Sequence, residues 1–246
     1  MKILGIDTTT KVLCLGLYVD GEFYEYNLEV GRSLSELLAP TIRRVVSAIG
    51  LKIADIDYFA CGLGPGSFTG MRIGVATIKG LSIVRNKPVI GISSLDILAK
   101  NAGPAERLIV TALDARRGLI YCSSYKYETG FLKRKSGYLL LSLDEFLRKF
   151  SAKPIVLGDA ISLYGDKISA AIKGAVLLDK DYWALQAHNL MELALIKINS
   201  KQFTPLKVRT KGAAATSGDL LLTGFTSALN VKPIYLYPKE CQIKTK

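Results

Sequence analysis

Hydrophobic positions in the first hundred residues form short runs and alternating stretches that predict three strands at the start of the chain. The runs KILGID and VLCLGLYV are typical of buried strands, and EFYEYNLEV alternates after the turn signal Asp20-Gly21. Apolar side chains in residues 34–49 recur at helical spacing on one face. IDYFACGL then predicts a strand, residues 69–85 a second helix, PVIGIS a strand and LDILAKNA a short helix. The chain therefore opens with a β-β-β-α-β-α unit.

A similar order begins again after Pro104. RLIVTALD and GLIYCSSYKY predict strands paired around a turn at residues 115–117, SGYLLLS predicts a third strand, and LDEFLRKF predicts a helix. PIVLGD and AVLLD predict two further strands before a long helix at 183–199. Two successive units of one pattern predict a duplicated α/β fold of two ribonuclease-H-like lobes with a cleft between them. The actin, Hsp70 and sugar-kinase superfamily has this architecture, which is an analogy of fold alone.

We expect three parts: a first lobe at 1–103, a second at 104–200, and a C-terminal extension at 201–246 with a surface insertion. Charge is divided unevenly among them. The chain has 33 basic and 21 acidic residues and a net charge of +12. Residues 1–103 carry 11 basic and 9 acidic side chains (+2), and residues 104–246 carry 22 and 12 (+10). Such an excess permits a polyanionic partner such as RNA, although many basic proteins bind none.

Cysteine and histidine usage narrows the chemistry. The chain has four cysteines, Cys14, Cys61, Cys122 and Cys241, and no two of them form a CxxC pair. The first three lie in apolar stretches, so we expect buried, reduced thiols and no metal site. His188 is the only histidine, and the helical spacing around it favours a packed or surface position over a ligand or base. No apolar run approaches the roughly 20 residues of a membrane span, and the start lacks a signal-peptide pattern. We therefore expect a cytoplasmic protein.

Both predicted units end their first strand at an acidic residue, Asp7 and Asp114. In folds of this architecture such aspartates face the cleft and orient metal and phosphates. A structural alternative for the stretch DTTT is an aspartate that caps its own turn with help from the hydroxyl groups. The residues alone leave both interpretations open, and with them an ATP-dependent phosphotransferase.

The stretch GLGPGSFTGMRIG at residues 62–74 fails three tests for catalytic or nucleotide-binding loops. A Walker A loop needs Lys after its last glycine, but Gly70 is followed by Met71. A nucleophile elbow needs glycine where Pro65 stands, and a GxGxxG loop needs glycine where Thr69 stands. Two interpretations remain: an anion held by the start of the following helix, or small residues that allow close packing.

At this loop the sequence resembles the TsaB (YeaZ) family, whose members are needed to make N6-threonylcarbamoyladenosine beside the tRNA anticodon. The resemblance extends over nearly the full length and rests on these stretches: GIDTTT, LSELLAPTI, GLGPGSFTGMRIGVATIKGLS, PVIGISSLDILA, ALDARRGLIYCSSY, LGD and PIYLYPKECQI. A long GPGSFTGxRIG with ALDARxG behind it is a specific combination.

The resemblance implies a protein that is not itself catalytic. Members of this family act as the partner of the transferase TsaD, with the ATPase TsaE as a third component, and form a homodimer when alone. The resemblance leaves open whether an ATP or ADP binds at the subunit interface and whether the chain makes a weak or indirect contact with tRNA. TsaD-like proteins hold their metal through two histidines at helical spacing, whereas this chain has only His188.

The resemblance also implies site residues. The partner interface carried over to the two first-lobe helices comprises Leu34, Leu37, Leu38, Thr41, Ile42, Val45, Gly70, Met71, Gly74, Val75 and Ile78. There we expect small residues beside exposed apolar side chains such as Met71 and Ile78. The residues that could bind a nucleotide or anion are Asp7, Thr8, Thr9, Ser67, Phe68, Thr69, Gly70, Arg72 and Asp114.

The sequence departs from the family at two places. Many members have histidine where Leu34 stands, so a polar role there is lost and a hydrophobic contact remains. The segment 205–230, between the last predicted helix and PIYLY, is longer than expected for the family. We expect an inserted helix or hairpin there, whose Lys207, Arg209 and Lys211 are candidates for an RNA contact.

Overall fold

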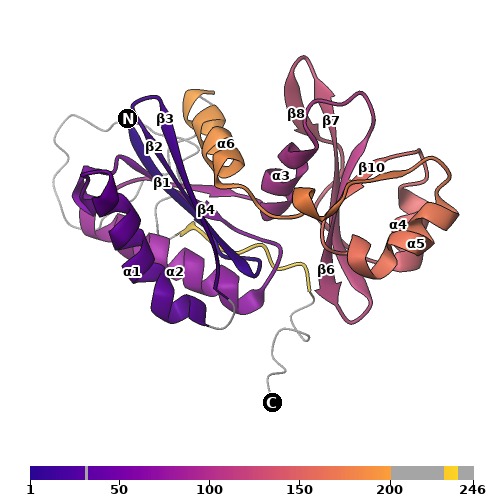
Figure 1. Ribbon diagram of the computed structural model, residues 1–246, viewed down its shortest axis with the longest axis horizontal. Helices are drawn as coiled ribbons and strands as arrows, with labels where there is room; N and C mark the ends of the chain where they lie inside the picture. The colour runs from indigo at the N-terminus through magenta and orange to yellow at the C-terminus, as the bar shows by residue number, and fades with distance from the viewer. Residues whose placement is uncertain (31–32, 201–229, 238–246) are drawn as a thin grey trace, which may run out of the picture.

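The computed structural model describes residues 1–30, 33–200 and 230–237, without the side chain of Arg85 (Figure 1). The predicted insertion at 205–230 and Cys241 therefore lie outside the described residues, apart from residue 230. None of the described helices combines the length and the apolar character needed to cross a membrane.

The first sheet has the strand order β3-β2-β1-β4-β5. The first three strands are antiparallel, and β4 and β5 run parallel to β1. The strands are β1 (Lys2–Asp7), β2 (Val12–Val19), β3 (Glu22–Glu29), β4 (Tyr58–Gly62) and β5 (Val89–Ile92). Two helices, α1 (Leu34–Ala48) and α2 (Phe68–Arg85), cover one face of this sheet. A short helix α3 (Ser94–Ala99) follows β5.

The second sheet repeats this order as β11-β10-β6-β7-β8, with β9 paired to β7. Its strands are β6 (Ile109–Arg116), β7 (Leu119–Glu128), β8 (Phe131–Arg134), β9 (Leu139–Ser142), β10 (Ile155–Leu157) and β11 (Val176–Leu177). Helices α4 (Leu143–Lys149) and α5 (Ile161–Ala171) cover one face of it. In each sheet the first strand of the lobe lies between its antiparallel second strand and the first of two parallel strands, β4 or β10, which confirms the predicted duplicated ribonuclease-H-like fold.

Helix α5 was missing from the prediction. Only Ile168 of its residues is fully buried, while Leu163 is 57% exposed, so its apolar stripe is too short to stand out in the sequence. The predicted helix at 183–199 begins later, as α6 (Ala187–Asn199), after a 3-10 turn at Lys180–Tyr182.

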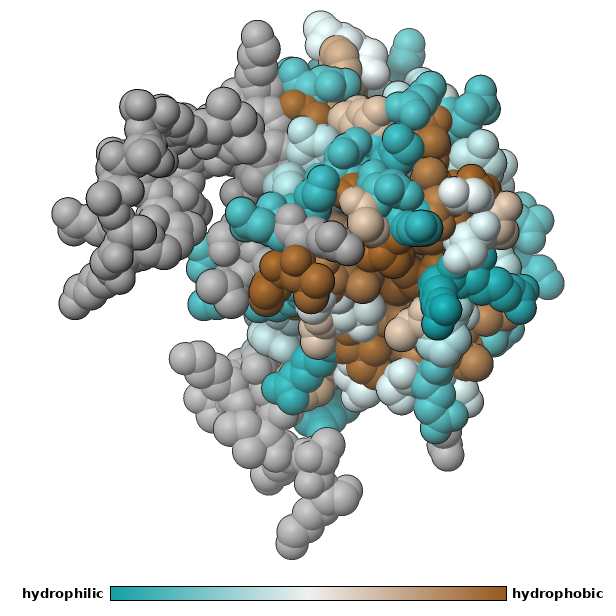
Figure 2. Space-filling view, turned by 90° about the vertical axis from the view of Figure 1, so that its left-hand side faces the viewer, coloured by the Kyte–Doolittle hydropathy of each residue, from teal (hydrophilic) through white to brown (hydrophobic). Residues whose placement is uncertain are grey.

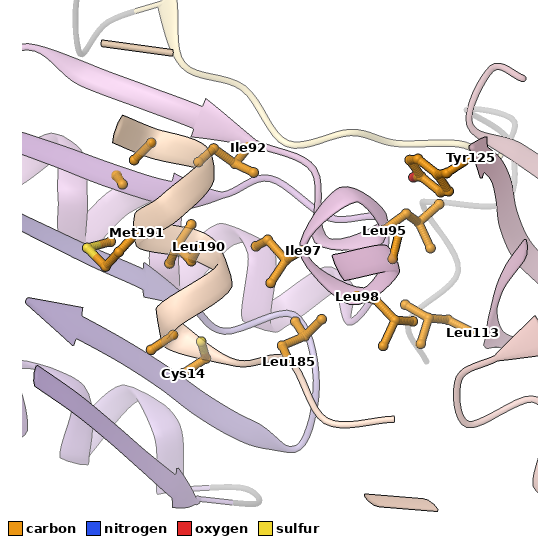
Figure 3. Close-up of a cluster of buried hydrophobic side chains, with 14 of the residues drawn as sticks. Cys14, Ile92, Leu95, Ile97, Leu98, Leu113, Tyr125, Leu185, Leu190 and Met191 are labelled. Carbon is orange, nitrogen blue, oxygen red and sulfur yellow. The ribbon is translucent and has the colours of Figure 1, made fainter. Parts of the chain in front are cut away.

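Helix α6 returns from the second lobe and packs against β1, β2 and β3 of the first sheet (Figure 1). Its Leu190 and Met191 belong to a buried cluster that also contains Leu95 of α3, Leu113 of β6 and Tyr125 of β7 (Figure 3). The two lobes therefore share one hydrophobic core, with α3 and α6 at its centre. The lobe boundaries given above stay a prediction, and the position of α6 favours placing it with the first lobe.

Leu190→Ala should lower the free energy of unfolding by about 2–5 kcal/mol, because it leaves a cavity in this shared core. Ile196→Ala on the same helix removes a side chain that is 40% exposed and should cost less than about 1 kcal/mol. Urea denaturation of both variants measures the difference. Equal losses would show that α6 is not buried as described.

Candidate functional site

The carboxyl group of Asp7, at the end of β1, is the centre of a buried hydrogen-bond network. Its Oδ1 accepts a hydrogen bond from the Thr9 N–H at 2.7 Å, and its Oδ2 accepts one from the Ser94 hydroxyl at 2.5 Å. The Ser94 oxygen in turn accepts hydrogen bonds from the Thr9 hydroxyl at 2.9 Å and from the Gly64 N–H at 3.2 Å. Burial raises the pKa of Asp7, and the hydrogen bonds oppose that rise. The network joins the turn after β1 to the loop after β4 and to the start of α3.

Two glycines, one at the end of β4 and one in the loop after it, allow this network to form. A Cβ atom at Gly62 would lie 1.9 Å from Asp7 Oδ2, so a side chain cannot be accommodated there. Gly64 has a φ of +90°, a conformation that favours glycine. Its carbonyl oxygen accepts hydrogen bonds from the Ser94 N–H at 2.8 Å and from the Ser93 hydroxyl at 3.0 Å. The loop is thus held by the same residues that hold Asp7.

Helix α2 begins directly against the turn that follows β1. The Thr8 hydroxyl donates a hydrogen bond to the Gly70 carbonyl at 2.8 Å, and Ser67 caps the helix by accepting one from the Gly70 N–H at 3.2 Å. A Cβ at Gly70 would lie 2.0 Å from the Thr8 carbonyl oxygen, and one at Gly74 would lie 2.2 Å from Thr8 Oγ1. These glycines therefore serve close packing within the chain, which was one of the two interpretations left open.

A cavity of about 670 Å³ lies between the two lobes. The turn after β1 and the start of α2 line it from the first lobe, and the end of β6 with Asp159 lines it from the second. Its walls comprise Thr9, Thr10, Lys11, Gly66, Ser67, Phe68, Met71, Leu113, Asp114, Ala115, Arg116, Tyr121, Asp159, Tyr235, Leu236 and Tyr237.

Asp114 lines this cavity, but its polar groups already have partners in the same lobe. Its Oδ1 accepts a hydrogen bond from the Arg116 N–H at 2.8 Å, and its Oδ2 lies 3.0 Å from the Arg116 guanidinium group. The Asp114 N–H donates to Asp159 Oδ1 at 2.8 Å. Desolvation raises the pKa of Asp159, and the nearby Asp114 carboxylate acts in the same direction.

Residues 230–237 cross from one lobe to the other and close one side of the cavity (Figure 1). The Ile234 N–H donates to the Leu63 carbonyl of the first lobe at 2.7 Å. The Tyr237 hydroxyl donates to the Ala115 carbonyl of the second lobe at 2.7 Å. Between these contacts, the centroid of the Tyr235 ring lies 5.4 Å from the centroid of the Phe68 ring. The C-terminal segment therefore connects the two lobes directly.

The structure brings together only part of the predicted nucleotide or anion site. Thr9, Ser67, Phe68 and Asp114 line the cavity, whereas Asp7, Thr8, Thr69, Gly70 and Arg72 do not. The expectation that both first-strand aspartates face the cleft is correct for Asp114 and wrong for Asp7. Asp7 is fully buried under Gly62, and both of its oxygens accept hydrogen bonds. It therefore does not fit a site that orients a metal-bound nucleotide.

Sequence reasoning missed several cavity residues, among them Lys11, Tyr121, Asp159 and residues 235–237. In the sequence Asp159 closes the predicted strand PIVLGD, as Asp7 and Asp114 close theirs, so that pattern could have found it. The tyrosines give no such signal, because their position depends on where the chain returns after α6. Burial raises the pKa of Tyr121 to about 12.

The predicted partner interface is largely buried within its own lobe. Leu34, Leu38, Ile42, Gly70, Met71, Gly74, Val75 and Ile78 are buried, Thr41 and Val45 are half-buried, and Leu37 is exposed. The expectation of exposed side chains at Met71 and Ile78 is wrong, because both face inward from α2: Met71 is 2% and Ile78 0% exposed. Helical spacing identifies an apolar face but does not say which neighbour covers it.

Other apolar side chains are exposed on α1 and α2. Val84 is 78% exposed, Ile83 54% and Leu37 40%. Figure 2 looks onto the end of the molecule that carries α1 and shows hydrophobic side chains gathered among hydrophilic ones. On α1, Ala39, Pro40, Arg43, Arg44 and Ser47 line a shallow groove. Leu37 lies near the start of α1, and Ile83 and Val84 lie at the end of α2. We call these three exposed side chains together the apolar helix patch.

The thiols and the histidine lie where the sequence indicated. Cys14, Cys61 and Cys122 are buried and free, and burial raises the pKa of each. His188 lies on the surface of α6, beside the ring of Phe23 and 4.0 Å from Glu192. Within the described part of the chain, no three His, Cys, Asp or Glu side chains lie close enough together to hold a metal ion.

Comparisons with known proteins agree with one another. A family model described as TsaD, tRNA N6-adenosine threonylcarbamoyltransferase, matches residues 28–200. The tRNA threonylcarbamoyladenosine biosynthesis protein TsaB of Escherichia coli is 29% identical over 79% of this chain and 86% of its own. TsaB of Bacillus subtilis is 31% identical over 68% and 75%. A crystal structure titled YeaZ from Pseudomonas aeruginosa covers 96% of this chain and 99% of its own with a TM-score of 0.73 at 21% identity, which shows a common fold.

Gly74→Ala should lower the free energy of unfolding by about 1–3 kcal/mol, because its Cβ would meet Thr8. Gly80→Ala on the same helix meets open space and should raise stability by about 0.5–1 kcal/mol. Urea denaturation distinguishes the two. A neutral Gly74→Ala would contradict the packing of α2 on the turn after β1.

Asp7→Asn should change the pH dependence of stability. Because the pKa of Asp7 is raised on folding, its contribution to stability is present below the unfolded pKa and is lost as pH rises through the folded pKa. The free energy of unfolding of the variant, relative to the unmodified protein, should therefore rise as the pH increases above about 4, the unfolded pKa of an aspartate. Urea titrations across this range measure it, and a difference that is flat or falls would rule out a buried carboxyl group with a raised pKa.

Proposed function

The chain belongs to the TsaB family of tRNA threonylcarbamoyladenosine biosynthesis proteins, and we propose that it takes part in making N6-threonylcarbamoyladenosine in tRNA as the non-catalytic partner of the transferase TsaD. The observation that carries this proposal is the similarity to curated TsaB proteins over most of the chain. The modification lies beside the anticodon, so TsaD and tRNA are the molecules with which this chain must work.

The geometry of the first lobe supports a partner more than an enzyme. The residue that the architecture would use to orient phosphates, Asp7, has both oxygens engaged by Thr9 and Ser94 and has no exposed surface. Asp7 occupies the space beside Gly62, and Thr8 of the same chain occupies the space beside Gly70 and Gly74 of α2. The curated relatives from Escherichia coli and Bacillus subtilis are TsaB proteins, and the first-strand carboxylate Asp7 is not available to an ATP-dependent phosphotransferase. We therefore do not retain that alternative.

The apolar helix patch is the surface we assign to the partner. Leu37, Ile83 and Val84 expose hydrophobic side chains on neighbouring helices, where burial against a second protein is favourable. Gly80 and Ala76 lie on the same stretch of α2, and the Cβ position of Gly80 is open. A helix of another subunit can approach α2 closely there.

Two further associations belong to the proposal. The ATPase TsaE joins the complex as its third component, and in the absence of TsaD the apolar helix patch pairs with a second copy of this chain. Both uses of one patch are mutually exclusive, so addition of TsaD should convert homodimer into heterodimer. Size-exclusion chromatography with light scattering follows that conversion.

Val84→Glu should weaken binding to TsaD by about 100-fold or more, because the carboxylate would be buried at the interface without a partner. The side chain is 78% exposed in the isolated chain, so the fold should tolerate the change. Leu163→Glu is the matched control, since Leu163 is 57% exposed on α5 of the second lobe. Co-elution with TsaD and titration calorimetry measure both variants. Undiminished co-elution of Val84→Glu would remove the interface assignment.

A further inference from the structure

The hairpin of β7 and β8 carries a group of cations on one face. The register pairs Lys126 with Lys133 and Glu128 with Phe131, and Lys135 donates its backbone N–H to Ser124. Opposed residues of an antiparallel pair share a face, and alternate residues of one strand do too. Lys126, Glu128, Phe131, Lys133 and Lys135 therefore lie on the same side, and we call them the basic hairpin face.

Positive charge on this face exceeds what its one carboxylate can neutralise. Glu128 pairs with Lys135 at 2.5 Å and with Lys133 at 3.9 Å. Its pKa is lowered first by the hydrogen bond from Lys135, and the charges of Lys133 and Lys126 add to this. Three ammonium groups thus surround a single carboxylate, which leaves an excess of two positive charges at the hairpin.

The excess extends along β7 toward α4. Cys122 and Lys126 are four positions apart on one strand, so their side chains lie on the same face. Helix α4, which carries Lys149, packs over the face of β7 that includes Cys122. Basic side chains therefore follow one face of the second lobe from α4 to the hairpin turn.

Protection of a sheet edge does not explain this arrangement. Lysines on an edge strand such as β8 can prevent unwanted strand pairing. However, Phe131 stands among them at the hairpin turn with 59% of its surface exposed, and a large exposed aromatic ring on an edge favours association. Lys126 and Lys133 are also directly opposed, which is unfavourable for two like charges. The exposed ring and the opposed lysines are both unfavourable in the free protein, and a bound ligand that covers the ring and neutralises the charge would stabilise them.

Polyanions with exposed bases fit this combination. Lysines contact phosphates, and an exposed aromatic ring can stack on an unpaired base. The hairpin lies at the top of the second lobe, whereas α1 and α2 lie on the outer side of the first lobe (Figure 1). A protein bound to the apolar helix patch would leave it accessible.

We propose that the basic hairpin face binds the phosphate backbone of tRNA and that Phe131 stacks on an unpaired base. This inference rests on the proposed function, which makes tRNA the substrate of the complex. It concerns residues on the described second lobe and is independent of Lys207, Arg209 and Lys211, which lie outside the described residues.

The test measures binding of an unmodified tRNA transcript by fluorescence anisotropy over a series of salt concentrations, for the full chain and for its complex with TsaD. The triple variant K126Q/K133Q/K135Q should bind about tenfold or more weakly at about 0.1 M salt, and its plot of log affinity against log salt should be shallower by about 2–3. Phe131→Ala should lower affinity about fivefold or more with an unchanged salt slope.

The matched control is K167Q/K173Q/K180Q, which removes three exposed lysines elsewhere in the second lobe. Its affinity should remain within about threefold of the unmodified protein. Equal losses in the two triple variants, or no loss in K126Q/K133Q/K135Q, would overturn the proposal. Co-elution with TsaD, measured without tRNA, distinguishes failure of this inference from failure of the proposed function. If the chain still co-elutes with TsaD while the hairpin changes have no effect on tRNA binding, only this inference fails.

Discussion

The buried carboxyl group of Asp7 determines how the first lobe is assembled. It joins three segments that are distant in sequence: the turn after β1, the glycine loop after β4 and the start of α3. A buried carboxyl group is costly unless its oxygens have hydrogen-bond partners, so the surrounding residues are fixed in type as well as position. Gly62 must lack a side chain, Ser94 must carry a hydroxyl group, and Gly64 must adopt its positive φ.

Helix α2 and the cleft follow from this network. Thr8 and Thr9 come directly after Asp7, and they hold the start of α2 through Gly70 and Ser67. The helix is thereby set close to the sheet, with Met71 and Ile78 in the core. Its outer side is left to Ile83 and Val84, which form most of the apolar helix patch. An enzyme of this architecture would use the aspartate at the end of its first strand to orient phosphates. In this chain Asp7 instead sets the position of α2 and, through it, of the apolar helix patch.

The sequence predicted the duplicated fold because each unit carries the same order of strands and helices, and periodicity reports on local structure. It also excluded the Walker A, nucleophile-elbow and GxGxxG patterns for the glycine loop, and it left anion binding open. Exposure was harder to predict: the spacing of Leu34, Leu38 and Ile42 reveals an apolar face, but the burial of that face against the first sheet depends on tertiary packing. For the same reason Asp7 and Asp114, alike in sequence, differ in the structure. Tyr235 and Tyr237 reach the cleft only because the C-terminal segment crosses between lobes.

We propose that the work is divided between two proteins, with this chain supplying surfaces and TsaD the chemistry. The most direct test is reconstitution of the modification from TsaD, TsaE, threonylcarbamoyl-adenylate and tRNA, with this chain, with its Asp7→Asn variant, or with neither. The account predicts that the modified nucleoside forms only when the chain is present and that Asp7→Asn supports nearly the same yield. Modification without the chain, or its loss with Asp7→Asn in a complex that still assembles, would contradict it.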